Sequence, residues 1–224
     1  MLKQINSKKI LSLHPSAFLL AAQIFSLVLY AGFEELPSGR TIIGIAGVLV
    51  LALAVWVVNR SPAENWIAWT LAVLALSLSI ISEFSHNNAL LIGASIIEAI
   101  LYFYTASSLI AYMMEDNNVT TDEMFAAAAT FTVLAWGFAY LYLACQNVFP
   151  NSFINAMDQS QPNTFLELLF LSFANLSATG LSDILPITPP GRVLVMLEQF
   201  AGVAYIAVVV SRLVGLTMLR YERR

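Results

Sequence analysis

The stretch FLELLFLSFANLSATGLSD, residues 165–183, decides how this chain folds. Its first 12 residues are mainly apolar, and a helix of that length at about 1.5 Å of rise per residue is about 18 Å long. Such a helix cannot cross a hydrocarbon core of about 30 Å. Small and hydroxyl-bearing residues follow at once, in residues 177–183. The pattern predicts a re-entrant helix that stops at mid-depth in a membrane and continues as irregular chain.

The residues before this helix carry a start signal. Thr164 and Glu167 form the S/T-x-x-E pattern, in which a hydroxyl and a carboxylate satisfy free backbone N–H groups. Thr120 and Glu123 repeat the pattern before another apolar stretch. We expect a helix to begin at each site.

The rest of the chain consists mostly of longer apolar stretches. Of its 224 residues, 59% are hydrophobic and 11% are charged, which is too apolar for a water-soluble domain. About 20 apolar residues suffice to cross a bilayer as a helix. We therefore expect an all-α integral membrane protein with six transmembrane helices, at about residues 15–33, 41–58, 66–81, 89–114, 124–148 and 192–219.

The basic residues predict the orientation, because cytoplasmic segments retain Lys and Arg. Most of them fall near the two chain ends or in the second connection, whereas Arg40 and Arg192 fall on the opposite side. Both termini are then cytoplasmic and residues 149–190, with the short helix, face outward. We expect a multi-pass protein of the cell (plasma) membrane, in contact with lipid.

Several classes of function are excluded. The chain has 10 basic and 14 acidic residues, so it offers no electropositive surface for a nucleic acid. Its one cysteine, Cys145, has no partner for an intramolecular disulfide. No catalytic, phosphate-binding or metal-ligand motif is present, so we expect no enzyme activity and no cofactor.

A helix that stops at mid-depth directs its partly negative C-terminal end at the space beyond it, which favours cations. Carbonyl and hydroxyl oxygens of the following residues could replace the water around such an ion. Residues 177–183 are therefore a candidate selectivity filter: Ser177, Ala178, Thr179, Gly180, Leu181, Ser182 and Asp183. The alternative is an ordinary outer turn, which Gly and Ser also favour.

Residues 172–183, the Asp183-Ile184-Leu185-Pro186 stretch and the run from Thr188 to Arg192 resemble the pore loop of the tetrameric potassium-channel superfamily. Residues 197–205 and 211–216 resemble the inner helix of its prokaryotic six-span members. The likeness covers residues 119–216, and the first four spans match only in number and length. It implies a homotetramer in which residues 119–224 form the pore domain and residues 1–118 a four-helix domain.

The chain departs from the family at the filter itself. The resemblance places the family's TVGYG on residues 178–182, so a monovalent cation would bind at Ala178, Thr179, Gly180 and Leu181. Only the central Gly180 survives, and Ser182 in a left-handed backbone would cost about 1 kcal/mol. Leu181 replaces a tyrosine that is tied behind the filter, and Phe170 and Leu171 stand where tryptophans often brace it. We expect reduced selectivity for K⁺ over Na⁺.

Three further residues are candidates for function. Glu198 recurs in the resembling channels and is expected to brace the pore helix. Gly202 is either a gating hinge, as the resemblance implies, or a site of close helix packing. Glu98 lies within the fourth span, where an acid is either part of a proton or ion relay or is hydrogen-bonded between helices.

The acidic connection from Glu115 to Glu123 is expected to be solvated, with Ca²⁺ binding as the weaker alternative because the EF-hand spacing is missing. His14 and His86 are expected to be isolated. No Lys or Arg lies between Arg60 and Arg192, so the fourth span lacks the charges of a voltage sensor.

These patterns predict a passive cation channel with a potassium-channel-like pore, an altered filter and K⁺ or Na⁺ as permeant ions. A nonselective cation channel and a non-conducting accessory subunit remain as alternatives. A transporter or an intramembrane enzyme is more remote.

Overall fold

The computed structural model describes residues 14–33, 39–58, 65–85, 87–115, 120–156 and 161–222. Helices make up most of this part of the chain. They are α2 (Pro15–Phe33), α3 (Gly39–Val58), α4 (Asn65–Ser85), α5 (Asn88–Met114), α6 (Thr121–Val148), the short α7 (Phe165–Leu176), α8 (Pro189–Tyr205), the π-helix η1 (Ile206–Val210) and α9 (Ser211–Glu222).

The helix predictions are confirmed as elements. Helices α2 and α7 have the predicted bounds, and the other stretches begin or end within a few residues of the predicted ones. The prediction misses two short strands, β1 (Phe153–Asn155) and β2 (Ile184–Pro186), which pair in an antiparallel sheet. Each has three residues, which is too short for an alternating pattern to be recognised.

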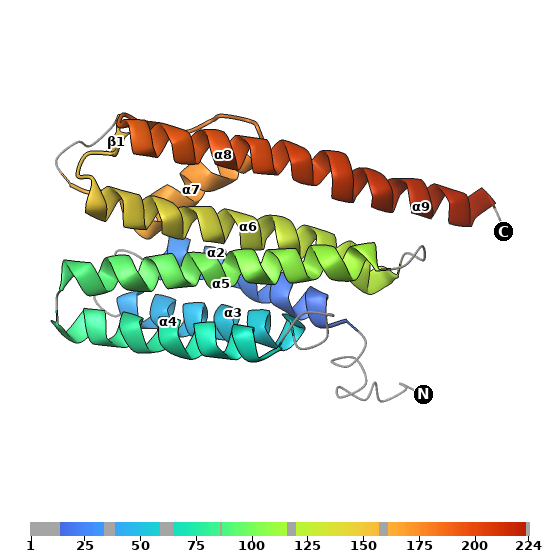
Figure 1. Ribbon diagram of the computed structural model, residues 1–224, viewed down its shortest axis with the longest axis horizontal. Helices are drawn as coiled ribbons and strands as arrows, with labels where there is room; N and C mark the ends of the chain where they lie inside the picture. Colours follow the sequence, from blue (N-terminus) through green and yellow to red (C-terminus); the bar gives the residue numbers. More distant parts are fainter. Residues whose placement is uncertain are drawn as a thin grey trace.

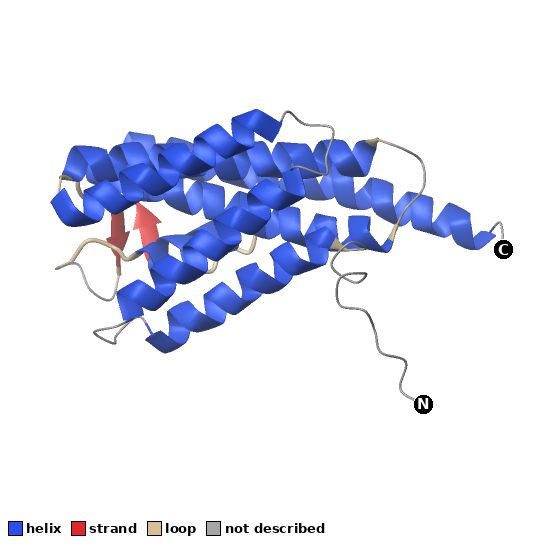
Figure 2. Ribbon diagram, turned by 90° about the horizontal axis from the view of Figure 1, so that it is seen from below, coloured by secondary structure: helices blue, strands red, loops and turns tan. Residues whose placement is uncertain are grey.

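The long helices lie side by side with their axes along the length of the molecule (Figure 1). The short helix α7 is inclined against them, between α6 and α8. The two strands lie at the end of the molecule opposite α9, as both ribbon views show (Figure 2). The sheet therefore lies at one end of the helix bundle, next to the start of α7.

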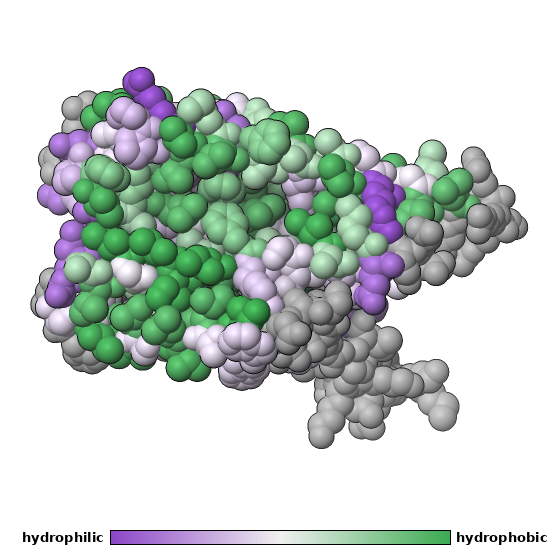
Figure 3. All heavy atoms as spheres, in the orientation of Figure 1, coloured by the Kyte–Doolittle hydropathy of each residue, from purple (hydrophilic) through white to green (hydrophobic). Residues whose placement is uncertain are grey.

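Four helical stretches of the described residues are long and apolar enough to cross a membrane: Pro15–Gly32, Asn88–Met114, Thr121–Val148 and Pro189–Leu219. Trp66–Ser82 and Phe165–Leu176 are shorter apolar helices. Figure 3 shows apolar side chains over the middle of one face, with polar residues near both ends. This arrangement is that of an all-α, multi-pass membrane protein, because a bilayer requires an apolar surface between two polar ones.

Helix α6 is the centre of the packing. Its residues Ala126, Val133, Trp136 and Ala139 are buried in the main core, together with side chains of α2, α5 and α7. Thr132 of α6 donates a hydrogen bond to Gln23 Oε1 of α2 at 2.6 Å. Helix α2 therefore packs against α6, the helix that precedes α7 in the sequence.

Candidate functional site

The start of α7 is fixed by the predicted capping box. Thr164 Oγ1 accepts the backbone N–H of Glu167 at 3.3 Å, and Glu167 Oε2 accepts the backbone N–H of Thr164 at 2.6 Å. The other oxygen of this carboxylate, Oε1, accepts Asn155 Nδ2 of strand β1 at 2.8 Å. The helix therefore begins at a defined point and is bonded there to the sheet.

The end of α7 is hydrogen-bonded to residues 177–183, which we call the strip. The Ala174 carbonyl accepts the backbone N–H groups of Thr179 at 3.1 Å and Gly180 at 3.0 Å. It also accepts the Thr179 hydroxyl at 3.1 Å, while the Ser177 hydroxyl donates to the Phe173 carbonyl at 2.7 Å. Hydroxyl groups that were predicted to face an ion thus direct their protons back to the helix end. Their oxygen lone pairs, which an ion would use, are separate from these donations.

The backbone of the strip is left-handed at two positions. Positive φ angles occur at Gly180, with φ 66°, and at Ala178, with φ 58°. Ser182 is not among the described residues with positive φ, so it does not bear the steric cost that a left-handed backbone would impose there. Its hydroxyl instead accepts the backbone N–H of Ile184 at 3.1 Å, which holds it in an ordinary turn. The residue that carries the steric cost is Ala178, because the chain reverses directly after the helix end.

The predicted cation positions are accessible in the chain. Ala178, Thr179 and Gly180 are exposed, and Leu181 is 76% exposed. Leu181 therefore does not pack behind the strip as the family's tyrosine would. Asp183 is exposed next to them, whereas Ile184 is 1% exposed and starts the buried strand. Five of the seven candidate filter residues are thus exposed at the end of α7, and Ser177 and Ser182 are half-buried.

Glu198 lies at the meeting point of three helices. It is 0% exposed, and its carboxylate accepts hydrogen bonds from Tyr142 of α6 and Ser172 of α7. Ser172 also hydrogen-bonds the Ala135 carbonyl of α6 at 2.7 Å. The geometry agrees with the expected bracing role. The partners Tyr142 and Ser172 escape the sequence analysis, since nothing in an apolar run indicates which helix its few polar residues face.

Gly202 is a point of close contact. A Cβ atom at this position would lie 2.0 Å from the carbonyl oxygen of Leu176, the last residue of α7. The structure therefore favours the packing interpretation of Gly202. The irregular part of the same long helix is η1, four residues further on, where the backbone takes π-helical form.

A second side-chain contact links α7 to α8. Gln199 Nε2 donates to Asn175 Oδ1 at 3.1 Å, and Asn175 is only 6% exposed. Sequence analysis singles out neither residue. Their positions, two residues before Ser177 and directly after Glu198, are the one available signal.

Glu98 has the interhelical partner that one of its two interpretations requires. Its Oε1 accepts the Ser79 hydroxyl of α4 at 2.8 Å. It lies away from the candidate filter, between α4 and α5, so the structure separates it from the other candidate residues.

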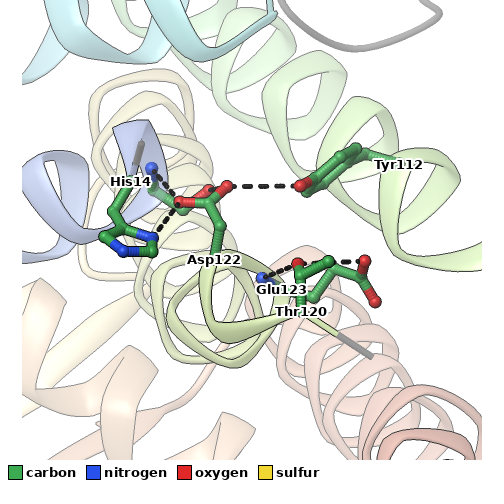
Figure 4. A network of polar contacts seen from close by, with 6 residues as sticks. His14, Tyr112, Thr120, Asp122 and Glu123 are labelled. Carbon is green, nitrogen blue, oxygen red and sulfur yellow. Dashed lines mark hydrogen bonds and ion pairs between the residues drawn. The ribbon is translucent and has the colours of Figure 1, made fainter. Parts of the chain in front are cut away.

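The beginning of α6 holds a second polar network (Figure 4). Asp122 accepts the Ser16 backbone N–H at 3.2 Å, the Ser16 hydroxyl at 3.0 Å and the Tyr112 hydroxyl at 3.4 Å. His14 Nδ1 lies 4.0 Å from Asp122 Oδ1. The first N–H groups of a helix have no acceptor within that helix, so the Ser16 N–H of α2 can donate to Asp122 of α6. The network thus ties α2, α5 and α6 together.

This network corrects two expectations. Asp122 and Glu123 are 6% and 5% exposed, so the prediction of a solvated acidic connection is wrong for them. Asp122 is buried because it caps α2, and Thr120 caps the backbone N–H of Glu123 at 3.2 Å as predicted. His14 contacts Asp122 and is not isolated, while His86 and residues 116–119 lie outside the described residues. Within the described part of the chain, no group of three or more His, Cys, Asp or Glu could hold a metal ion.

A short helix between two long apolar ones, followed by an exposed strip, defines a membrane protein with a pore-loop arrangement. A family model described as "Ion channel" matches residues 99–218, which is more than half of the chain. The chain belongs to this ion-channel family. The match extends from α5 through α9 and includes all the candidate filter residues. No curated protein and no solved structure matches the chain.

Proposed function

We propose that this protein is a passive channel for monovalent cations, with a potassium-channel-like pore and an altered filter. The observation that carries the proposal is the strip of residues 177–183, most of which is exposed at the C-terminal end of α7, in a chain of an ion-channel family. The partly negative helix end favours a cation there, and the carbonyl and hydroxyl oxygens of the strip are suitable ligands.

The proposed assembly is a homotetramer. One strip supplies only part of the oxygens that surround a dehydrated ion, so several copies have to meet at an axis. Helix α8 has an apolar face that its own chain leaves exposed: Val193, Met196, Leu197, Phe200 and Val203. Its opposite face, with Val195, Glu198 and Gly202, is buried against α6 and α7. A face of this kind suits contacts with a second copy of the chain around a pore.

We propose six membrane spans, α2, α3, α4, α5, α6 and the continuous α8–η1–α9 helix, with α7 re-entrant. Residues 1–118 then form a four-helix domain and residues 119–224 the pore domain. An even number of spans places both termini on one side, and the basic residues near both chain ends favour the cytoplasmic side of the plasma membrane. The lack of Lys or Arg from residue 61 to 191 supports a channel without a voltage sensor.

The proposed ions are K⁺ and Na⁺, with K⁺ the first candidate and reduced discrimination between them. Leu181 is exposed and so gives the strip no brace from behind, and a strip held less rigidly discriminates less between ions of different radius. Asp183, exposed at the outer end, would attract cations as a ring of four carboxylates. No bound cofactor is required for this function.

A non-conducting accessory subunit is the second candidate. The hydroxyl protons of Ser177 and Thr179 are directed to the carbonyls of Phe173 and Ala174, and Ala178 takes the left-handed backbone that a glycine adopts without cost. These features favour a strip that is folded onto its helix.

Current measurements on the purified protein in planar bilayers distinguish the cation channel from the accessory subunit. Under K⁺/Na⁺ and K⁺/Cl⁻ gradients, the channel proposal predicts a current whose reversal potential moves toward the cation potentials, and only partly toward that of K⁺. A reversal potential that follows Cl⁻ contradicts the proposal. The absence of current at every voltage supports the accessory subunit.

A further inference from the structure

The strip and α7 belong to a closed frame of contacts. The inner end of the strip is bonded to the end of α7 through the Ala174 carbonyl. Its outer end, Asp183, leads directly into strand β2, and β2 pairs with β1. Strand β1 is in turn bonded to the start of α7 through Asn155 and Glu167. The frame therefore runs from α7 to the strip, through the sheet and back to α7.

Two further backbone hydrogen bonds flank the paired residues of β1 and β2, one on each side. The carbonyl of Asp183 accepts the backbone N–H of Ala156 at 2.8 Å, so the pairing extends into the last residue of the strip. At the other end, Ile187 donates its N–H to the Ser152 carbonyl at 2.8 Å. Residues 183–187 are thus bonded along their length to residues 152–156.

The sheet is anchored in its turn to the body of the protein. Asn163 Nδ2 donates to the Phe153 carbonyl of β1 at 2.8 Å. Gln146 of α6 donates its Nε2 to the Asn163 carbonyl at 2.9 Å. Phe153 and Ile184 are 4% and 1% exposed in a core shared with Tyr142 and Leu168. Strand β1 is therefore a fixed support, to which the strip and the start of α7 are both attached.

A side-chain hydrogen bond between Asn155 and Glu167 closes this frame. Asn155 is 8% exposed, and its amide donates to one oxygen of the carboxylate whose other oxygen caps α7. An amide donor and a carboxylate acceptor fit each other only in this direction. Two donors or two acceptors placed here would repel each other.

We infer that Asn155 and Glu167 are positioning residues for the selectivity strip, holding it through β1 and β2 at the outer end of α7. The inference rests on the proposed channel function. It assigns to polar contacts and a short sheet the bracing that an aromatic side chain behind the filter would provide, since Leu181 is exposed in this chain. The strip is then held by its outer end rather than from behind.

A donor–acceptor exchange tests the inference. The variants are Asn155→Asp, Glu167→Gln and the two combined, with Gln161→Glu as a control. Asn155→Asp sets two carboxylates against each other, and Glu167→Gln removes one of the two acceptors. In the combined variant the glutamine amide donates to the new carboxylate while its oxygen still caps Thr164. Gln161 is exposed on the same outer segment, so its substitution adds the same charge outside the frame.

Two measurements are made on each variant. The first is hydrogen exchange of the Thr179 and Gly180 amides, which are bonded to the Ala174 carbonyl at 3.1 and 3.0 Å. The second is the K⁺/Na⁺ permeability ratio from reversal potentials. We expect exchange to quicken about threefold or more in each single variant. The permeability ratio should fall about threefold. Both quantities return toward the wild-type values in the combined variant and stay unchanged in the control.

Exchange requires no current, so it decides the frame separately from the channel function. Unchanged exchange in both single variants overturns the inference, whether or not the wild type conducts. Faster exchange with an unchanged permeability ratio in a conducting channel overturns the role in selectivity. A wild type without cation current contradicts the proposed function, and the exchange result still decides the frame.

Discussion

Gly180 and Gly202 meet different physical demands: Gly180 through its backbone angle, and Gly202 through its close neighbour. Gly180 has a φ of 66° and nothing within 4 Å of the place where a Cβ would be. Gly202 has ordinary helical backbone, but a Cβ would meet the Leu176 carbonyl oxygen at 2.0 Å. Substitution by alanine therefore costs strain at the first and overlap at the second.

Gly202→Ala should separate α7 from α8. The Leu176 carbonyl belongs to the backbone and cannot move aside without displacing the end of α7. The free energy of unfolding should therefore fall by about 1–3 kcal/mol. The measurement is the thermal unfolding midpoint in detergent. Gly215→Ala is the matched control, because that glycine is also helical and has nothing within 4 Å of its Cβ position. Equal midpoints for the two variants would contradict the close contact.

Gly180→Ala tests the strip. The new methyl group has room, but a left-handed alanine costs about 1–2 kcal/mol, so the strip should change conformation while the rest of the fold persists. We expect cation current to be lost and the oligomer size to stay unchanged on a sizing column. Gly93→Ala in α5, which also has open space around its Cβ position, is the control and should conduct normally. Continued current in Gly180→Ala would rule out this filter assignment.

At the residue scale, the sequence indicates which residues form the strip but not their backbone angles. The position of the strip follows from the end of the apolar run at Leu176. The left-handed residues are Ala178 and Gly180, because the turn is set by hydrogen bonds to the Ala174 carbonyl. The Ala174 carbonyl is available as an acceptor because it lies in the last turn of α7. The residue types within the strip do not indicate which carbonyl their N–H groups will contact.

At the scale of elements, Glu198 joins α6, α7 and α8. A buried carboxylate is stable only where donors satisfy it, and Tyr142 and Ser172 provide them from two different helices. Helix α7, which leads into the strip, and helix α8 are thereby held at a fixed separation. The contact supports the geometry of the site without touching the strip.

Tyr142→Phe and Ser172→Ala should each destabilise the protein by about 1–2 kcal/mol, because each leaves part of the carboxylate unsatisfied. The combined variant should differ from the sum of the two, since both donors serve one acceptor. Chemical denaturation in detergent measures the three values. Ser107→Ala, which removes an exposed hydroxyl that donates to the Tyr104 carbonyl of its own helix at 2.8 Å, should be nearly neutral. Strict additivity of the two substitutions would argue against a shared carboxylate.

Elements differ in how far the sequence predicts them. The long helices and α7 follow from apolar runs and capping residues, which act locally. The strands β1 and β2 depend on each other across about 30 residues of sequence and have no pattern of their own. The π-helical turn η1 lies in an unbroken apolar run, Ile206–Val210, and nothing in its composition distinguishes it from α-helix.

At the scale of the whole molecule, the sequence predicts where the long helices lie along the chain better than it predicts which helices contact each other. In a membrane chain the apolar residues surround each helix, so periodicity does not indicate which face is buried. The contact between α2 and α6 depends instead on dispersed polar residues, such as Gln23 with Thr132 and Ser16 with Asp122. These pairs are over 100 residues apart in sequence.

Asp183→Asn tests the proposed outer mouth of the assembled channel. Four carboxylates around one entrance would raise the local cation concentration, and salt screens that effect over about 10 Å at 0.1 M. Single-channel current should therefore fall in low salt, by about half, and change little near 1 M salt. Equal currents at low salt would assign Asp183 to the loop alone.

The central claim is that several copies of the strip around Thr179 and Gly180 surround one axis. An electron cryomicroscopy structure of the full chain in lipid nanodiscs tests it most directly. The account predicts four subunits, with the exposed face of α8 turned inward and the four strips lining a shared passage. Strips on the lipid-facing perimeter, or subunits with no passage beside them, would contradict it.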